Sequence, residues 1–495
     1  MGTLDFLKPA LRFLPEIKAP QYQPRIQERL IWVLVALLAF FIMYNIPAVG
    51  VNPARFASID FLQVVTASRM GSLLTTGIGP IVLASIFLQL FAGAKIIKVD
   101  MSNPEEKATF QGAQKLLAIA LCFVEAAIYI LASSANNNAG GFLLEPPFFG
   151  SLVAMQAIVI LQIALGSLIL LYLDEIVSKY GIGSGISLFI AAGVSLSVVG
   201  GTINLLTGQN GVVDALLGGG AEALPSALIV LLPLFFTAVV FLVVVYAEGI
   251  KVEIPLAFER ARGLGSRFPI KFLYVSNIPV ILASALMLNL SFMAPALEGK
   301  HMCIGGDLLE AEGVCSGGVD LVQLVGFSSG GRMYDGLLYF ISPIYHPANS
   351  NFGAYMNLLA TSKTPLFGIP EYVHVITYVI FMMVLCVLFG KFWVETANMS
   401  ARDVATQLDN SGLQIPGFRR DPRIIERILE RYIPTITILG SAFVGLLAAL
   451  ADMTGALGTG TGILLTVGIL HKFYEDLEAR NAFDSMPVLS KLFGN

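Results

Sequence analysis

The chain has 495 residues, of which 56% are hydrophobic and 13% are charged, and its mean hydropathy is +0.77. A soluble protein of this length carries about twice that charged fraction, so a wholly soluble fold is excluded and the lipid bilayer is the expected solvent. The formal net charge of −4 is small, but it conceals an uneven distribution of lysine and arginine along the chain.

The first 29 residues, MGTLDFLKPALRFLPEIKAPQYQPRIQER, mix charges and prolines ahead of the first apolar run. They lack the small-residue cleavage site of a secretory signal peptide, so we expect no cleavable signal. Apolar residues between positions 4 and 14 alternate with Lys8 and Arg12, a pattern that favours a short amphipathic helix. Such a helix would lie on the membrane surface or form an ordered cap on the helix bundle.

Windows of about 20 apolar residues predict membrane spans. Backbone groups must be paired inside lipid, and runs of this length select helices over a barrel. Ten spans follow along the chain: Ile31–Gly50, Gly77–Ile97, Leu116–Ser134, Leu152–Leu173, Ile186–Leu206, Ala227–Ala247, Phe272–Ala294, Val373–Phe392, Ile433–Ala451 and Gly460–Phe473. An even number of spans places both termini on the same side.

The connecting segments suggest how the chain is organised. After the first span, a half-span at about 54–66 is too short and too polar to cross the membrane. A glycine-rich external loop, 207–224, separates an N-terminal half (1–206) from a C-terminal half (225–495). Three longer hydrophilic segments lie in the second half: cytoplasmic loops 248–271 and 395–431, and an external loop, 295–372, that we expect to pack over the bundle.

Lysine and arginine fall mostly on one face of this topology. If the N-terminus is cytoplasmic, only Arg55, Arg69, Lys300, Arg332 and Lys363 lie outside, which leaves 25 of the 30 basic residues on the cytoplasmic side. This is the distribution that the positive-inside rule describes. We therefore expect both termini in the cytoplasm.

Three apolar runs begin with glycines: GIGPIVLASIFLQL at Gly77–Leu90, GIGSGISLFIAAG at Gly181–Gly193 and GTGTGILLTVGIL at Gly458–Leu470. The last two share Gly-x-Gly-x-Gly-Ile-x-Leu and open the final span of each half from opposite faces, as inverted repeats do. Small residues here are typical of close helix packing. The alternative is that these helices meet at a common axis, where their aliphatic side chains exclude water and block ions.

Chemistry-bearing residues are scarce in the spans. Glu125 is the clear intramembrane carboxylate, expected to face a water-filled vestibule or a cation, and Asp174 and Asp452 stand at span ends. A secondary transporter usually has several such groups near a broken helix, so an ion-coupled pathway is poorly supported. No catalytic triad, HExxH or P-loop occurs, and the four histidines form no metal-ligand spacing, so neither an enzyme nor a cofactor is expected.

Two of the four cysteines, Cys122 and Cys386, lie inside spans and are expected to be small buried hydrophobes. Cys303 and Cys315 share the external loop, where an oxidising compartment would permit a disulfide, and free thiols are equally compatible with the sequence. The two basic cytoplasmic loops also have two interpretations. They fix topology and attract anionic lipid, or their arginines bind phosphate on an RNA-bearing partner.

Several segments in order along the chain resemble the SecY family, the large subunit of the Sec protein translocon, in its archaeal form. The matching segments include TASRMGSLLTTGIGPIVLASIFLQL, FQGAQKLLAIALCFVEA, LYLDEIVSKYGIGSGISLFIAAG, VYAEGIKVEIPLA, PIKFLYVSNIPVILASAL, FWVETA and SAFVGLLAAL followed by GALGTGTGILLTV. The resemblance covers almost the whole chain except the external loop 298–372. It implies an all-α membrane protein with ten helices in two inverted halves around an hourglass pore.

The resemblance also assigns roles to residues. A ring of apolar side chains at the waist falls on Ile78, Val82, Ile186, Ile190, Ile281 and Leu465. The half-span resembles the plug that closes the ring from outside, through Arg55, Phe56, Ser58, Ile59, Phe61 and Leu62. Polar positions of the lateral gate match Gln114 and Asn289, while Leu83 stands where relatives can carry threonine. Ribosome-contacting loop positions match Arg260, Arg262, Arg267, Arg419 and Arg420.

The function that these features predict is a passive protein-conducting channel in the cell membrane. Nascent polypeptides would pass through the ring, and apolar segments would leave sideways into lipid. The expected partners are the ribosome with its RNA, signal sequences and nascent chains, lipid, and small membrane subunits resembling SecE and the beta subunit. A secondary transporter with inverted repeats is the alternative, and a membrane scaffold is a third possibility.

Overall fold

The structure is a computed structural model of the full chain. It describes residues 8–11, 14–22, 24–51, 67–93, 96–97, 99, 103–134, 143, 151–208, 211–217, 223–258, 265–275, 277–291, 302–304, 307–309, 314–316, 319–329, 332–344, 352–365, 367–410, 413–414 and 422–485. The predicted plug segment and its six residues lie outside this part, as do Arg260, Arg262, Arg419 and Arg420.

The ten expected spans each correspond to one described helix. In chain order these are α2 (Ile26–Asn45), α4 (Gly79–Gly93), α5 (Pro104–Ser134), α6 (Leu152–Tyr180), α7 (Gly185–Thr207), α9 (Ala223–Gly249), α10 (Ile278–Ser291), α15 (Glu371–Thr396), α17 (Pro422–Met453) and α18 (Gly460–Ser485). Seven of them are long and apolar enough to cross a bilayer unaided. The chain is a multi-pass membrane protein of the all-α class.

Two of the remaining helices are short. α4 has 15 residues and α10 has 14, which at 1.5 Å per residue is about 22 Å, less than the hydrocarbon thickness. Both run beside longer helices: α4 packs against α5, and α10 packs against α15. The residues at their starts, Gly79 of α4 and Val280 of α10, are buried, so both helices begin inside the bundle.

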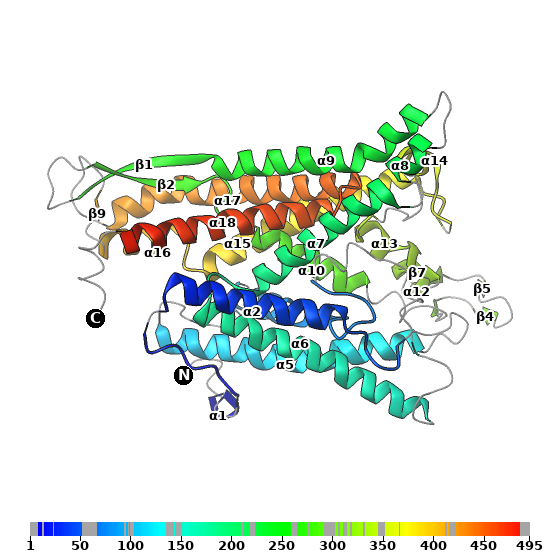
Figure 1. Ribbon diagram of the computed structural model, residues 1–495, viewed down its shortest axis with the longest axis horizontal. Coiled ribbons are helices and arrows are strands. Elements are labelled where there is room, and N and C mark those ends of the chain that lie inside the picture. Colours follow the sequence, from blue (N-terminus) through cyan, green and yellow to red (C-terminus); the bar gives the residue numbers. More distant parts are fainter. Residues whose placement is uncertain are drawn as a thin grey trace.

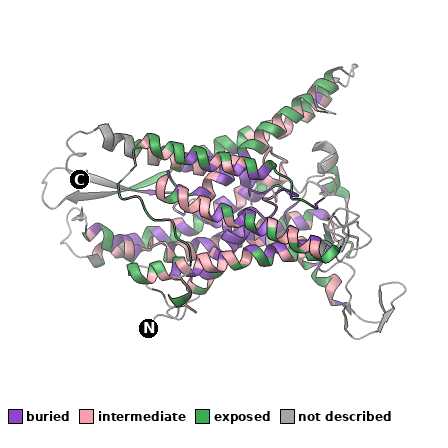
Figure 2. Cartoon of the chain, turned by 60° about the horizontal axis from the view of Figure 1, so that its bottom comes forward, coloured by how far each residue is buried: buried purple, intermediate pink, exposed green. Residues whose placement is uncertain are grey.

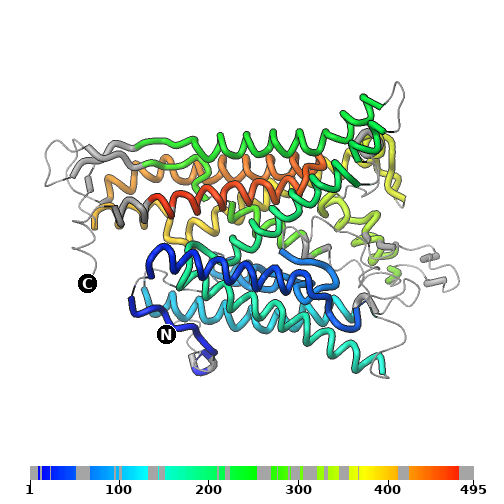
Figure 3. Tube along the Cα trace, in the orientation of Figure 1, coloured from blue at the N-terminus to red at the C-terminus, as the bar shows by residue number. Residues whose placement is uncertain are grey.

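The two halves lie side by side and are inverted with respect to each other. The first half occupies the lower part of the bundle in Figures 1 and 3, and the second half the upper part. α7 and α18, which close the two halves, run in opposite directions (Figure 1) and pack against each other. The sequence prediction of inverted repeats rested on these two helices.

Burial follows the expected pattern for a bundle in lipid. Buried residues gather between the helices, whereas the outer faces are exposed (Figure 2). Outward-facing apolar side chains such as Leu38, Leu242 and Val384 are 54%, 65% and 57% exposed. These faces need lipid, or a partner helix, to be stable.

At one end of the bundle the two basic loops form a small sheet. Strands β1 (Lys251–Phe258) and β2 (Gly265–Lys271) make an antiparallel hairpin, and β9 (Leu413–Gln414) pairs with the other edge of β1 in the order β2-β1-β9. Helix α16 (Ala401–Asn410) packs on α17 through an apolar cluster that includes Val404 and Leu429. Segment 395–431, expected as a loop, is thus partly helical.

The external loop carries short elements at the opposite end. These are β3 (Cys303–Ile304), β4 (Asp307–Leu309), β5 (Val314–Ser316), β6 (Val319–Asp320), α12 (Leu321–Val325), β7 (Phe327–Ser329), β8 (Arg332–Asp335), α13 (Leu337–Ile341) and α14 (Phe352–Thr361). The loop packs on the bundle: the carbonyl of Ser342 accepts a 3.0 Å hydrogen bond from His374 Nε2, and Tyr339 donates one of 2.6 Å to Glu371. The remaining helices are α1 (Lys8–Leu11) and α8 (Val212–Leu217), the latter between the halves.

Candidate functional site

The six predicted ring residues come from four helices of both halves. Ile78 immediately precedes α4, which carries Val82, and α7 carries Ile186 and Ile190. From the second half, α10 contributes Ile281 and α18 contributes Leu465.

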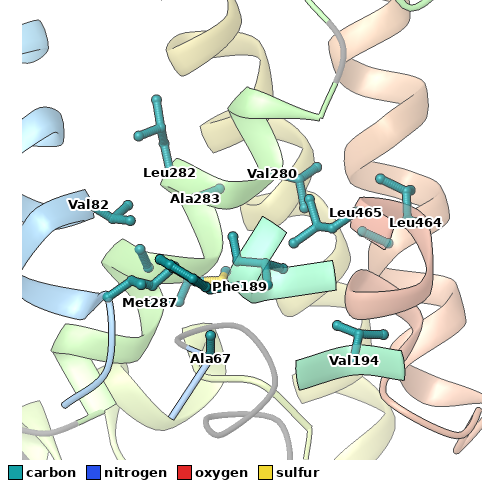
Figure 4. Close-up of a cluster of buried hydrophobic side chains, with 14 of the residues drawn as sticks. Ala67, Val82, Phe189, Val194, Val280, Leu282, Ala283, Met287, Leu464 and Leu465 are labelled. Carbon is teal, nitrogen blue, oxygen red and sulfur yellow. The ribbon is translucent and has the colours of Figure 1, made fainter. Parts of the chain in front are cut away.

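All six belong to one continuous apolar cluster. Ile190 and Leu465 are 0% exposed and Ile78 is 1% exposed, whereas Ile186 and Ile281 are partly buried against the cluster. Figure 4 shows Val82, Phe189, Val194 and Leu465 directed toward the same region from three different helices. The structure places all six residues in or against this one cluster, which is much larger than six side chains.

None of the six side chains has a polar atom. An ion that entered between them would lose its hydration shell without gaining a protein ligand, so such a constriction blocks ions by excluding water. Aliphatic side chains also make no directional bond, so they can contact a passing chain of any sequence. The cluster has the chemistry of an unselective seal.

Two aromatic residues that the sequence analysis did not single out support the ring helix α7. Phe189 stacks on Phe40 of α2, with ring centroids 5.2 Å apart and planes at 17°. Both side chains are fully buried, and an aromatic pair of this kind adds to the free energy of packing. Phe189 lies between the ring residues Ile186 and Ile190 in the sequence, and this position could have identified it as a residue that supports the ring.

Glu125 does not face a water-filled vestibule, so that half of the prediction is wrong, and the alternative of a partner cation stays a prediction. The residue is 8% exposed, and neither carboxylate oxygen has a hydrogen-bond partner among the described residues. Its Oε1 lies 3.0 Å from the point where a Cβ on Gly79 would stand. The carboxyl group is therefore packed against the first residue of α4.

The two halves also touch through α4. This first-half helix contacts both α10 and α15 of the second half. Of the two polar residues assigned to the gate, Gln114 on α5 donates a short hydrogen bond to Ser85 on α4, and Asn289 is on α10 with its side chain outside the described part. Helix α4 of the first half is thus adjacent to α10 and α15 of the second, and Gln114 makes its contact within the first half.

The described chain resumes after the predicted plug segment at Ala67. Ala67 is 0% exposed and belongs to the same apolar cluster as the ring residues (Figure 4). Its φ of +47° is in the left-handed region, which is uncommon for a residue with a Cβ. The described chain that follows residue 66 therefore starts inside the cluster.

Of the basic positions assigned to a ribosome, Arg267 is in the three-stranded sheet and the other four lie outside the described residues. Arg267 is on β2, opposite Pro255 of β1. Arg260 and Arg262 belong to the connection between these strands, and Arg419 and Arg420 follow β9. The fold thus joins the two basic loops, which are far apart in sequence, through shared backbone hydrogen bonds.

The cysteines divide as their positions predicted. Cys122 and Cys386 are free and buried. Cys303, in the external segment, is disulfide-bonded. Of the two states that the sequence left open for Cys303, the structure thus has the disulfide.

Comparisons with known proteins agree with this arrangement. The family model described as SecY matches residues 72–474. The protein translocase subunit SecY of Methanocaldococcus jannaschii is 41% identical over 98% of this chain and 99% of its own length.

Two solved structures at 40% identity have a similar fold. One is described as the structure of a protein-conducting channel; it covers 96% of this chain and 98% of that one, with a TM-score of 0.75. The other is Sec61 in the canine ribosome–channel complex from the endoplasmic reticulum, with coverage of 96% and 97% and a TM-score of 0.73.

Proposed function

The chain belongs to the SecY family and is a protein-conducting channel, and from this premise we propose that its seal is the ring of six apolar residues at Ile78, Val82, Ile186, Ile190, Ile281 and Leu465. The observation that carries the proposal is their placement in one buried cluster to which helices of both halves contribute. In the resting channel these side chains contact one another and exclude water. During translocation these side chains move apart to admit the polypeptide and then contact it from all sides.

An aliphatic seal is suited to this task because it dehydrates ions without binding them. It makes no specific hydrogen bond to the substrate, so secretory chains of unrelated sequence can pass. The channel is passive and catalyses no step of its own. Opening needs the helices that carry the ring to move apart, and α4 and α10 are short helices that begin within the bundle.

The contact of α4 with α10 and α15 is the lateral gate of this proposal. Separation of α4 and α5 from α10 and α15 would open a path from the pore to lipid. An apolar segment leaves by this path because it is more stable in hydrocarbon than in an aqueous pore. Gln114 and Asn289 line the gate, and the segment at 54–66 serves as the plug beneath the ring.

The sheet β2-β1-β9 is the proposed docking surface for a ribosome. It joins both basic loops, and its arginines suit bidentate binding of RNA phosphates. Binding should therefore fall as salt rises. Arg267, Arg260, Arg262, Arg419 and Arg420 are the contacts, and Sec61, a structural relative, occurs in a ribosome–channel complex.

The location and the remaining partners follow from the same premise. The excess of lysine and arginine on one side favours a cell-membrane protein with both termini in the cytoplasm. Small membrane subunits resembling SecE and the beta subunit would cover part of the exposed apolar surface. Signal sequences and nascent chains are the transported partners.

The seal is tested by replacing Ile78, Ile186 and Ile281 together with glycine and recording conductance of the resting channel in planar bilayers. We expect ion leakage, because the glycines leave a gap wide enough for water. A matched control replaces three exposed aliphatic residues with glycine: Ile203, Ile380 and Leu439, which are 58%, 56% and 56% exposed. Equal conductance in both triple variants would refute the ring.

A further inference from the structure

The helix α7 begins against a carboxylate at the end of the preceding helix. Asp174, near the end of α6, accepts a 2.9 Å hydrogen bond from the backbone N–H of Ile186 and one of 3.3 Å from the hydroxyl of Ser184. The first amides of a helix have no partner within it, so Asp174 supplies the missing acceptor.

The helix α18 begins in the same way. Asp452, the next-to-last residue of α17, accepts hydrogen bonds from Thr461 through its backbone N–H at 2.9 Å and its hydroxyl at 2.6 Å. Tyr378 of α15 donates a further bond of 2.9 Å, so this carboxylate ties three helices together.

These two arrangements are equivalent. In each half, a carboxylate near the end of the fourth membrane helix binds the backbone N–H of the second residue of the fifth, Ile186 or Thr461. The sixth residue of each fifth helix is a ring residue, Ile190 or Leu465. Both ring residues are 0% exposed. The shared glycine motif aligns Gly185 with Gly462. The helix starts instead pair Gly185 with Gly460, two residues earlier.

Close approach explains a glycine at each helix start. A Cβ on Gly185 would lie 2.5 Å from the Cα of Asp174. A Cβ on Gly460 would lie 2.1 Å from the Cβ of Ala451 and 2.5 Å from the backbone nitrogen of Asp452. Because real Cβ atoms do not approach so closely, glycine lets each helix start press against the end of the helix before it.

We propose that Asp174 and Asp452 are equivalent positioning residues, which hold α7 and α18 at the register where Ile190 and Leu465 close the seal. The inference rests on the proposed ring. The four residues between each helix start and its ring residue form little more than one rigid helical turn, so a fixed start fixes the ring residue. A carboxylate suits this role because it accepts several N–H and O–H bonds at the positive end of the helix dipole.

The test uses the full-length channel with Asp174→Ala and Asp452→Ala. Amide hydrogen exchange reports on residues 185–190 and 460–465, and planar-bilayer conductance reports on the seal. We expect exchange of these first turns to rise on the order of tenfold, as loss of a helix cap implies, together with a resting ion leak. Asn variants, which retain one acceptor oxygen, should restore both properties in part.

Two control variants accompany the Asp174 and Asp452 variants, together with two substitutions of Thr461 that perturb Asp452 less. Ser195→Ala removes a hydroxyl that bonds only within α7, and Thr466→Val removes a buried hydroxyl that has no partner in the described structure. Neither should change exchange or leak. Should Asp452→Ala not fold, Thr461→Ala removes a single donor to Asp452, and Thr461→Ser restores it.

The outcomes separate this inference from the proposed ring. Unchanged exchange in the Ala variants overturns it, because the helix starts would then be held by other contacts. Increased exchange without leak, in a channel whose ring-glycine variant does leak, also overturns it, because the carboxylates would stabilise the helices without setting the seal. A ring-glycine variant that stays tight instead refutes the proposed ring, and the positioning role fails with it whatever the exchange shows.

Discussion

The side-chain amide of Asn277 donates a 3.3 Å hydrogen bond to the backbone carbonyl of Leu465, and another of the same length to Leu464. Asn277 immediately precedes α10, and its own carbonyl accepts a hydrogen bond from the N–H of Ile281. Asn277 therefore bonds to the backbone of two ring residues, Ile281 of α10 and Leu465 of α18. The Asn277 residue is 3% exposed.

Asn277→Ala should loosen this connection. The two carbonyl acceptors remain within α18, so the expected loss is that of two ordinary hydrogen bonds, about 1–3 kcal/mol. Thermal unfolding of the purified channel measures the loss, with Thr466→Val as a control that removes no hydrogen bond between described residues. Equal melting temperatures for Asn277→Ala and the unmodified channel would show that the contact contributes nothing.

Gly468→Ala adds only one methyl group but should destabilise the folded channel. A Cβ at this position would lie 1.8 Å from Nδ2 of Asn277 and 3.0 Å from Oε1 of Glu248. The added methyl group must displace Asn277 from α18, and overpacking of this kind costs about 1–3 kcal/mol. The double variant Gly468→Ala with Asn277→Ala should recover part of that loss, and a purely additive result would contradict the account.

Tyr378→Phe removes one of the hydrogen bonds to the Asp452 carboxylate. Tyr378 is fully buried and its hydroxyl donates to the carboxylate. A hydrogen bond to a charged group contributes about 1.5–3 kcal/mol, so a lower melting temperature is expected. Tyr246→Phe, at a position 75% exposed, is the matched control. The two variants should differ clearly.

Glu175→Gln should release the N-terminal segment from the bundle. The Glu175 carboxylate accepts bonds from Lys115 at 2.7 Å, Lys179 at 2.9 Å and the backbone N–H of Ile17 at 3.1 Å. Because partly exposed ion pairs are weak, we expect trypsin to cut at Lys18 about two- to fivefold faster. Glu16→Gln, whose carboxylate is 77% exposed, should have little effect. Identical cleavage in both variants would mean that Glu175 does not anchor the segment.

The attachment of the external segment should weaken at high pH. Burial raises the pKa of Tyr339, and its hydrogen bond to the Glu371 carboxylate raises the pKa further. The unfolded segment ionises near pH 10 while the folded one stays protonated, so stability is fully present below pH ~10 and decreases above it. Protease resistance of the segment at pH 8 and 11 measures this loss. Tyr339→Phe should be less resistant at pH 8 and change less between the two values.

The sequence was sufficient to predict the ten membrane helices because hydrophobic runs report directly on lipid burial. It was less informative at their ends. α17 begins at Pro422, eleven residues before the predicted Ile433, because its first turns bury only one face, with Ile425 and Leu429 directed at α16. A window that averages hydropathy cannot detect such a one-sided pattern.

The ring residues could be assigned from the sequence, whereas the hydrogen bonds that hold the ring helices could not. Ile190 and Leu465 could be proposed from motifs within single helices. The bonds of Asp452 to Tyr378, or of Asn277 to Leu465, join residues 74 and 188 positions apart. No local pattern encodes these pairings, so Asp174 and Asp452 could be noted only as carboxylates at span ends, and Asn277 was missed.

Photocrosslinking of an arrested secretory chain tests the central claim most directly. A photoreactive residue is placed at each ring position in turn, with the lipid-facing Ile203 as the control. The account predicts that all six ring positions crosslink to the same short stretch of the arrested chain and that Ile203 does not. Crosslinks that are absent from the ring, or that occur equally at Ile203, would contradict it.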